Sequence, residues 1–502
     1  MGRRSEVFAV STVVFSLALE AILAVAGAQT PPLPAQMQGP LVSPEAVPSL
    51  APADQPTTLP YPAYGTPVPG VRNGVKIAGV PHIITLKAAV DLAVALSPSL
   101  AAARADVGVA AAEVRLARAG LLPALAGSLG STHEWYSNRN VQNGYQNSFQ
   151  STSSSVTNQQ FNSGSLSLNQ LIFDGGRTAA GIRAAKATET AAVYTYQRTL
   201  QTLAYNVASA YYATLQAERT TQVDAELVRE NQVQYALVLA QYRAGTAAYV
   251  DVVTAEVPVA QARVAVVQAQ GNEVAAQAAF ANTLGVDANA NVRPKDDTPV
   301  FRTSGLHTIA IPPYQTAMLR AQNLRPDLAA SQANIDAARA DVRQAKLGLF
   351  PTLSGSASQG YASTTLGGGN YTGTTSLGAT LSFPLFDQGQ TPARTAQARA
   401  NLDLAQANYQ TTLLGVQLNV RQTLAQLISA REAVSESQVA LDESQTVLKA
   451  TQAQYRAGVT TLPQLLNAQV SLTQALTSQV TTVYALRQAE QAFLYAVGEN
   501  TL

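Results

Sequence analysis

The sequence predicts a mainly α-helical fold with a smaller β portion, built from two copies of one long unit. Tyr-Arg-Ala-Gly at residues 242–245 recurs unchanged at residues 455–458. Each occurrence ends a long stretch with almost no Gly or Pro and precedes a second such stretch. That pattern is typical of a helical hairpin and its turn. We therefore expect two long helical hairpins arranged as a tandem repeat.

Matching residues in the two copies lie at constant spacings. Pro326 follows Pro98 at the same interval at which Pro351 follows Pro123. A second, shorter interval separates Phe173 from Phe386, Tyr242 from Tyr455, and Gly285 from Gly498. The second copy is thus shorter than the first within one polar, loop-like stretch, which in the first copy lies between Pro123 and Phe173. We predict a first repeat at residues 82–313 and a second repeat at residues 314–502.

Composition argues against several classes of function. A formal net charge of +1 with 13% charged residues gives no basic surface for nucleic acid. The chain has no Cys, which excludes disulfides, thiol catalysis and Cys-based zinc sites. The only histidines, His82, His133 and His307, are scattered, and no acid–base cluster or phosphate-binding motif accompanies them. We expect no enzyme activity, no cofactor and no metal site.

The N-terminus resembles an export signal. Arg3 and Arg4 precede a mostly apolar run, and Ala26-Gly27-Ala28 forms a small-residue cleavage site, so residues 1–28 are predicted to be a signal peptide. The alternative is an uncleaved membrane anchor, which Glu20 within the apolar run disfavours. Residues 29–81 carry 13 of the chain's 25 prolines and are predicted to form an extended leader.

Three helices are expected in each copy. They are opening helices at Ser99–Ala119 and Asp327–Leu347, long helices at Arg177–Arg243 and Ala393–Arg456, and return helices at about Ala247–Leu284 and Thr460–Val497. Each long helix would span roughly 100 Å. Apolar residues seven apart, such as Val434, Leu441, Leu448 and Tyr455, indicate coiled-coil packing. Residues 285–325 and the C-terminal end are expected to form a girdle where the shorter helices break.

Four segments alternate between apolar and small polar residues, as half-buried strands do. They are Leu125–Leu129, Leu166–Leu168, Leu353–Ala357 and Ser376–Phe383. We expect strands of about 9–11 residues, the length of a tilted membrane crossing. Because four strands cannot close into a membrane barrel, chains must pool them, two giving eight strands, three twelve and four sixteen. The pattern predicts a membrane pore with a hollow helical stalk.

The doubled helix–strand–strand–helix–turn–helix plan, the strand exits Phe173-Asp174-Gly175-Gly176 and Phe386-Asp387-Gln388-Gly389, and the repeated turns resemble the TolC family of outer-membrane efflux proteins. The resemblance covers about residues 85–498. It implies a homotrimer in the lipid of the bacterial outer membrane, with a twelve-stranded barrel and an α-helical tunnel through the periplasm. It also implies efflux or type I secretion of substrates that an inner-membrane pump delivers through a periplasmic adaptor protein.

Two other classes remain as alternatives, a periplasmic adaptor and a structural coiled-coil protein of the cell envelope. An adaptor would carry one hairpin flanked by compact β modules, and a coiled coil would carry no strands. The identity of the substrate and the class of pump are not legible in the sequence.

The resemblance places adaptor contact at the hairpin turns. The matching residues are Tyr242, Arg243, Gly245, Thr246, Tyr455, Arg456, Gly458 and Val459. Glycine suits a turn that needs positive φ, so an alternative for the two glycines is helix termination alone.

The resemblance also implies a periplasmic gate. In the family an Asp after the first turn can bond the Tyr before the second, and Asp251 and Tyr455 match these positions. Family members often carry two carboxylates after the second turn, but Gln464 and Asn467 stand there in this chain. The alternative for Asp251 is a helix-start residue favoured by the helix dipole.

Overall fold

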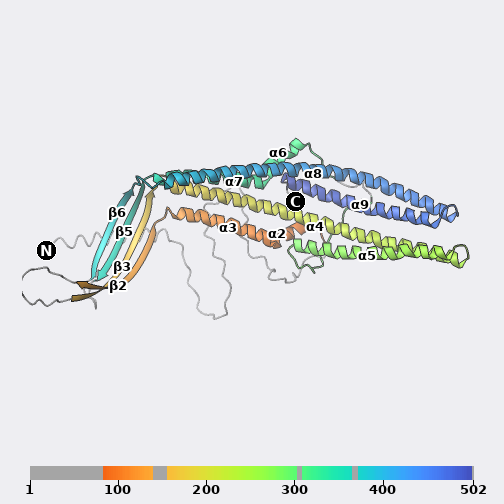
Figure 1. Cartoon of the computed structure of the whole chain (residues 1–502), viewed down its shortest axis with the longest axis horizontal. Coiled ribbons are helices and arrows are strands. Elements are labelled where there is room, and N and C mark those ends of the chain that lie inside the picture. Colours follow the sequence, from red (N-terminus) through yellow and green to blue (C-terminus); the bar gives the residue numbers. More distant parts are fainter. Residues whose placement is uncertain (1–82, 139–154, 302–307, 364–370, 500–502) are drawn as a thin grey trace, which may run out of the picture. The chain divides into compact units, whose positions relative to one another are not determined.

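The computed structural model describes residues 83–138, 155–301, 308–363 and 371–499 (Figure 1). All of them belong to one compact unit, residues 61–502. The predicted signal peptide at residues 1–28 and the predicted leader at residues 29–81 lie outside the described residues.

The same six elements occur twice in the same order. The first set is α2 (Leu86–Leu96), α3 (Pro98–Ala119), β2 (Ala124–Asn138), β3 (Ser155–Phe173), α4 (Arg177–Arg243) and α5 (Tyr249–Thr283). The second set is α6 (Tyr314–Leu324), α7 (Pro326–Lys346), β5 (Thr352–Ser363), β6 (Tyr371–Ser382), α8 (Gln390–Arg456) and α9 (Leu462–Val497). Between the two sets, β4 (Arg293–Pro294) pairs in parallel with β1 (Ile83–Ile84). A short 3₁₀ turn at Leu347–Leu349 follows α7.

The long helices α4 and α8 each have 67 residues, as the absence of helix breakers predicted. Along α4 lie first α3 and then α5, and α7 and α9 follow α8 in the same way (Figure 1). The predicted seven-residue pattern is buried in α8 at Val434, Leu441 and Leu448. Each copy therefore pairs one continuous helix with a broken one.

Two expectations about the elements were wrong. The helices α2 and α6 lie in stretches where no helix was predicted. Each is separated from the next helix because Pro98 and Pro326 push the preceding residue out of the helical region, so Ser97 and Arg325 are extended, with ψ of 121° and 117°. The strands have 12 to 19 residues, more than the 9–11 expected.

Among the described residues, no single helix combines the length and the apolar composition needed to cross a membrane. The helices α2 and α3, which meet at an angle of 51°, pass that test only as a pair and only by length and composition.

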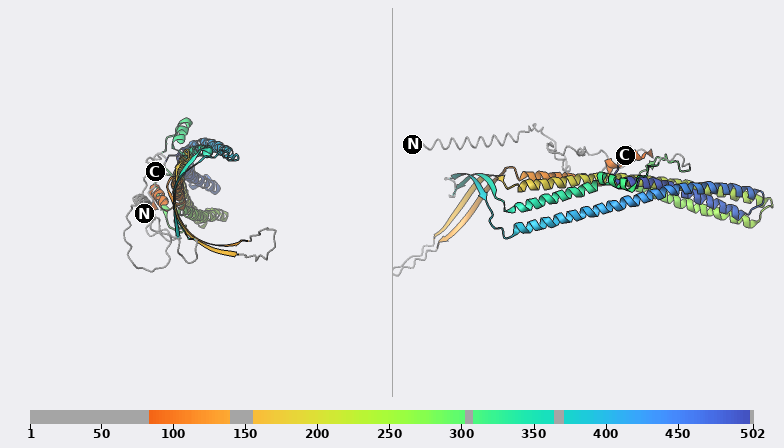
Figure 2. Two further views of the ribbon diagram at one scale, coloured as in Figure 1. Left: turned by 90° about the vertical axis from the view of Figure 1, so that its left-hand side faces the viewer. Right: turned by 90° about the horizontal axis from the view of Figure 1, so that it is seen from above.

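The four long strands form one antiparallel sheet in the order β2-β3-β5-β6, which curves at one end of the helices (Figure 2). Leucines share one face: Leu125 pairs with Leu168, and Leu353 pairs with Leu381. Small hydroxyl side chains share the other face, where Ser128 bonds Ser165 at 2.8 Å and Ser358 bonds Ser376 at 2.7 Å. Leu129, Leu377 and Leu381 are exposed, so the apolar face is uncovered in a single chain.

The largest core lies around the middle of the long helices, where α2 and α6 pack against them. Phe280 of α5 and Tyr484 of α9 are fully buried there, together with Val90 of α2 and Ala321 of α6. The predicted girdle at this height is therefore partly helical.

Two glycines show that the duplication extends to packing. Gly285 ends α5 with φ +78°, and a Cβ there would lie 3.0 Å from the backbone oxygen of Leu96 at the end of α2. Gly498 ends α9 with φ +84°, and a Cβ would lie 2.9 Å from the backbone oxygen of Leu324 at the end of α6. Leu96 and Leu324 are separated by the same interval as Pro98 and Pro326, so both repeats dock the same two helix ends.

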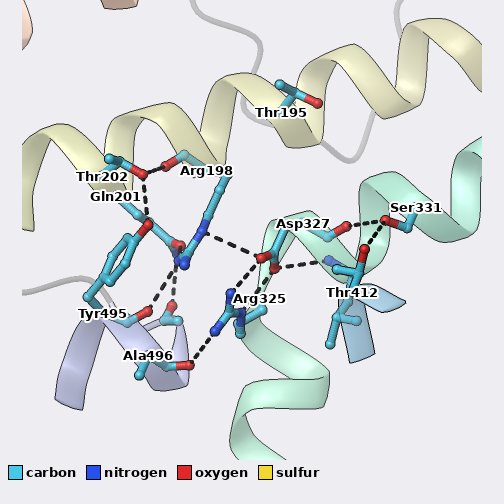
Figure 3. A network of polar contacts seen from close by, with 12 residues as sticks. Thr195, Arg198, Gln201, Thr202, Arg325, Asp327, Ser331, Thr412, Tyr495 and Ala496 are labelled. Carbon is cyan, nitrogen blue, oxygen red and sulfur yellow. Dashed lines mark hydrogen bonds and ion pairs between the residues drawn. The ribbon is translucent and has the colours of Figure 1, made fainter. Parts of the chain in front are cut away.

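A polar network fastens α4 to the second repeat near this core (Figure 3). The guanidinium of Arg325, almost fully buried, donates to both carboxylate oxygens of Asp327 at 3.0 and 2.6 Å and to the carbonyl of Ala496 at 3.1 Å. Arg198 of α4 lies 3.7 Å from the same carboxylate and stacks over the ring of Tyr495 at 3.8 Å. Burial would raise the pKa of Asp327, but hydrogen bonds and the two arginines hold it below the usual value.

Replacing Asp327 with Ala should destabilise the fold by about 3 kcal/mol at neutral pH, because it leaves a buried arginine charge unpaired. The matched control is Asp336→Ala, which removes an exposed pair with Arg339 and should cost less than about 0.5 kcal/mol. Denaturant unfolding of the detergent-solubilised protein measures both. Equal effects of the two substitutions would contradict the role assigned to Asp327.

The effect of Asp327 should depend on pH. Since the folded-state pKa of this carboxyl is depressed, its contribution to stability is complete above the ordinary Asp pKa of about 4 and is lost as the pH falls through the folded-state value. The stability difference between the wild type and Asp327→Ala should therefore shrink below about pH 4.

Candidate functional site

Both hairpin turns are built by the same helix-ending motif. At the end of α4, Gly245 has φ +76°, its N–H donates to the carbonyl of Tyr242 at 3.0 Å, and the N–H of Thr246 donates to the carbonyl of Gln241 at 2.9 Å. At the end of α8 the same bonds run from Gly458 to Tyr455 at 3.0 Å and from Val459 to Gln454 at 2.9 Å. This is the Schellman motif, which needs a left-handed residue at the glycine position.

Backbone conformation, rather than space, requires glycine at these turns. A Cβ at Gly245 or Gly458 would meet no other atom within 4 Å. A larger side chain would therefore project from the turn into open space while the backbone carries the strain of a positive φ.

Most of the residues predicted for adaptor contact are exposed at these turns. They are Tyr242, Arg243, Gly245, Thr246, Arg456, Gly458 and Val459. The turns lie at the end of the helices away from the sheet (Figure 1). The eighth residue, Tyr455, is half-buried and differs from the others.

Tyr455 lies between the two hairpins of the chain. Its hydroxyl donates to the side-chain oxygen of Gln241 on α4 at 3.2 Å. Its ring packs beside apolar residues of both hairpins, including Val252 of α5 and Leu465 of α9. Burial, and then the nearby negative charge of Asp251, raise the pKa of Tyr455, so the phenol stays protonated and remains a donor.

The predicted gate residues Asp251 and Gln464 occupy the same position in the two repeats, since the interval between them is the one that separates Tyr242 from Tyr455. A carboxylate oxygen of Asp251 accepts from the N–H of Ala248 at 3.1 Å, at the start of α5. The amide oxygen of Gln464 accepts from the N–H of Thr461 at 3.4 Å and from the hydroxyl of Thr460 at the start of α9. Both side chains thus cap a return helix, the role that was the alternative for Asp251.

The predicted gate residues therefore do not all make the contacts that the family pattern implies. Asp251 lies near Tyr455, but the hydroxyl of Tyr455 donates to Gln241. Asn467 is exposed on α9, where its backbone carbonyl accepts from Ser471 at 3.0 Å. Sequence reasoning missed Gln241, although the identical segment extends beyond the four turn residues and reads Ala-Gln-Tyr-Arg-Ala-Gly at 240–245 and 453–458.

The strand exits start the long helices at the opposite end. Asp174 accepts from the N–H of Gly176 at 3.0 Å and of Thr178 at 2.6 Å. Asp387 does the same for Gly389 at 3.2 Å and Thr391 at 2.7 Å. Each Asp satisfies backbone donors that a helix N-terminus leaves free, which explains why the Asp recurs in both repeats.

Within the described part of the chain, no group of three His, Asp or Glu side chains is placed to hold a metal ion. The candidate site therefore consists of two exposed turns.

The chain matches the sequence profile of the family described as outer membrane efflux protein, over residues 89–286 and 318–499. It is 29% identical over 425 residues to protein CyaE of Bordetella pertussis, covering 83% of this chain and 84% of that protein. It is 28% identical over 438 residues to the pyoverdine export outer membrane protein OpmQ of Pseudomonas aeruginosa, covering 85% and 87%.

Solved structures share the fold. The crystal structure of CusC superposes with a TM-score of 0.71 at 22% identity, covering 83% of this chain and 92% of that one. The outer membrane channel CmeC of Campylobacter jejuni superposes with a TM-score of 0.69 at 20% identity, covering 83% and 87%.

Removing the cap at the start of α4 should weaken the junction between strand and helix. Asp174→Ala is expected to lose about 1 kcal/mol of stability, because two backbone donors lose their acceptor. Asp174→Asn keeps one amide oxygen as an acceptor and should lose less. Denaturant unfolding compares the two variants, and an Asn variant as unstable as the Ala variant would contradict the capping role.

Proposed function

This chain belongs to the outer membrane efflux protein family, and we propose that three copies of it form one channel through the bacterial outer membrane. The four strands of each copy would close into a twelve-stranded barrel, and the helices would continue the channel as a tunnel into the periplasm. Substrates would enter from an inner-membrane pump through a periplasmic adaptor that contacts the hairpin turns, in efflux or in type I secretion.

The observation that carries this proposal is the open sheet. Among the residues that the structure describes, its outer strands, β2 and β6, each pair on one side only. The four strands alternate in direction, so β6 of one copy can pair antiparallel with β2 of the next. One face is leucine-rich and exposed, as lipid requires, and the other carries serine hydroxyls, as a water-filled interior requires.

The helices also carry apolar side chains that no other described part of the chain covers. Three positions that are buried in one repeat are exposed at the matching position of the other. The pairs are Val480 (0% exposed) and Val267 (68%), Leu215 (1%) and Ile428 (44%), and Ala337 (9%) and Val109 (59%). The buried members lie on α4 and on α7 and α9, which both pack against α4 within the chain, whereas the exposed members lie on α8, α3 and α5.

This difference follows if α8 of one copy packs against α3 and α5 of the next. A neighbouring copy would then bury the exposed apolar side chains in the way that the other repeat buries their counterparts. The contact between neighbouring copies would then repeat the contact between the two repeats of one chain. We call each such contact a seam. Three copies agree with the family resemblance and give six hairpins around one axis.

The hairpin turns support contact with an adaptor. Two copies of one exposed motif per chain, each with an arginine and an open glycine turn, would present six equivalent surfaces in a trimer. Arg243, Thr246, Arg456 and Val459 are free to meet a partner there, whereas Tyr455 is engaged within the chain.

The assembly can be tested by chemical crosslinking, because the natural chain has no Cys. Within the chain, Tyr205 of α4 stacks on Tyr495 of α9 with ring centroids 4.8 Å apart. Their counterparts in the other repeat are Leu418 of α8 and Asn282 of α5, both exposed. In the proposed trimer these two residues face each other across neighbouring copies.

A protein with Leu418→Cys and Asn282→Cys should form covalent dimers and trimers with a short bis-maleimide. The matched control with Tyr205→Cys and Tyr495→Cys should crosslink within one chain and keep the mobility of a monomer on a denaturing gel. Monomers alone from the first variant, with efficient crosslinking of the control, would contradict the proposed packing.

Replacing Gly245 and Gly458 with Leu should abolish transport while the trimer still assembles. The new side chains would enter the surface where an adaptor would dock, and their Cβ atoms would meet no other atom of the chain within 4 Å. Gly176→Leu with Gly389→Leu is the control, because those glycines have similar positive φ and similar space at the far end of the long helices. Export from cells and the amount of trimer are measured together, and normal export by the turn variant would refute the assignment.

A further inference from the structure

The seam between the two hairpins of one chain is closed at its tip by a single polar contact. Tyr455, one residue before the end of α8, donates its hydroxyl to Gln241 in the last turn of α4. Both residues are half-buried, and Val238, Val252 and Leu462 form a small apolar cluster beside them. The contact therefore lies at the packed end of the seam.

Each hairpin carries both halves of this contact. Gln454 is the counterpart of Gln241 and Tyr242 is the counterpart of Tyr455, since they hold the same places within the identical Ala-Gln-Tyr-Arg-Ala-Gly segments. A single chain has one seam and uses one glutamine and one tyrosine. The other pair, Gln454 and Tyr242, is exposed.

The exposed pair is placed for a seam between copies. Tyr242 lies beside Tyr249 of α5, with ring centroids 5.9 Å apart, and α5 borders one open edge of the chain. Gln454 lies on α8, which borders the other open edge. Repeating the internal seam from one copy to the next therefore brings Tyr242 of one chain to Gln454 of its neighbour.

We infer that Tyr242 donates to Gln454 of the neighbouring chain, so that a belt of six tyrosine-to-glutamine hydrogen bonds joins the hairpin tips. Three of the bonds lie within chains and three lie between chains. This inference rests on the proposed trimer and adds its gate: the belt holds the six tips together in the resting channel. Gln241 and Gln454 accept these hydrogen bonds, so they hold the tyrosines, and with them the tips, in the closed position.

The chemistry of the pair suits a reversible gate. Neither a phenol nor a carboxamide ionises near neutral pH, so closure does not depend on a charged pair. A neutral hydrogen bond makes a modest net contribution, which an arriving adaptor can replace with its own contacts. The carboxylate of Asp251, which the family pattern would assign to the gate, already accepts from the backbone of Ala248.

Crosslinking tests the geometry. With a bis-maleimide whose spacer matches the Tyr–Gln contact, the variant with Gln241→Cys and Tyr455→Cys should react within one chain. The variant with Tyr242→Cys and Gln454→Cys should give covalent dimers and trimers. If the second variant stays monomeric on a denaturing gel while native mass measurements show a trimer, the belt is refuted and the channel is not.

Single-channel conductance in a planar bilayer tests the role in closure. Tyr455→Phe and Tyr242→Phe each remove only a hydroxyl, and each should raise the open fraction at least about five-fold, the factor that corresponds to one net hydrogen bond. The double variant should exceed both. Tyr249→Phe is the control, because its counterpart Leu462 has no hydroxyl and cannot belong to a repeated belt.

The outcomes separate the two proposals. An effect of Tyr455→Phe without an effect of Tyr242→Phe would leave the contact within the chain and refute the belt. Wild-type protein that forms no trimer and never inserts into the bilayer would refute the channel itself, and the belt with it.

Discussion

The constraint on which the structure depends is apolar surface that one chain cannot cover. A four-stranded sheet has two unpaired edges, and a helix pair at the end of a row has one bare side. The helix α9 packs against α4 of the other repeat as well as against α8, whereas the main contact of its counterpart α5 is with α4 of its own hairpin. One chain thus contains one complete contact between repeats. On its two outer sides it carries the two halves of a second contact of the same kind. The proposed assembly of identical copies would complete it.

The two kinds of seam differ in chemistry near the central core. The seam within the chain carries the buried Arg325, which donates to Asp327, and the carboxylate of Asp327 also pairs with Arg198 of α4. At the matching positions of the first repeat stand Ser97 and Ser99, which bond each other at 2.9 Å. Burying charges costs free energy unless fixed partners pair with them, and a covalently joined repeat always supplies those partners. The first repeat, which would meet a neighbouring copy in the proposed trimer, carries the uncharged pair.

Sequence reasoning recovered what depends on strong local signals. The 67-residue helices follow from missing breakers, and the duplication follows from identical letters at fixed spacing. The helices α2 and α6 were missed because each has only 11 residues and ends at a residue held extended by Pro98 or Pro326. Strand lengths were underestimated because segments such as Thr157–Ser163 are polar at nearly every position, so alternation carries no signal there. Gln241 was missed because a glutamine on a helix surface has no pattern of its own.

At the hairpin tips, one pair of matching residues has the same role in both repeats and another pair has different contacts. Asp251 and Gln464 differ in charge but cap their return helices in the same way. The common requirement at this position is therefore an acceptor for the backbone N–H at the helix start. Tyr242 and Tyr455 are identical, yet one is exposed and one is half-buried, so their difference comes only from their neighbours. Where identical residues of the two repeats differ in burial, we infer that the exposed residue lies on the surface that a neighbouring copy would cover. For this protein that reasoning leads from the hydrogen bond between Tyr455 and Gln241 to the proposed belt between copies.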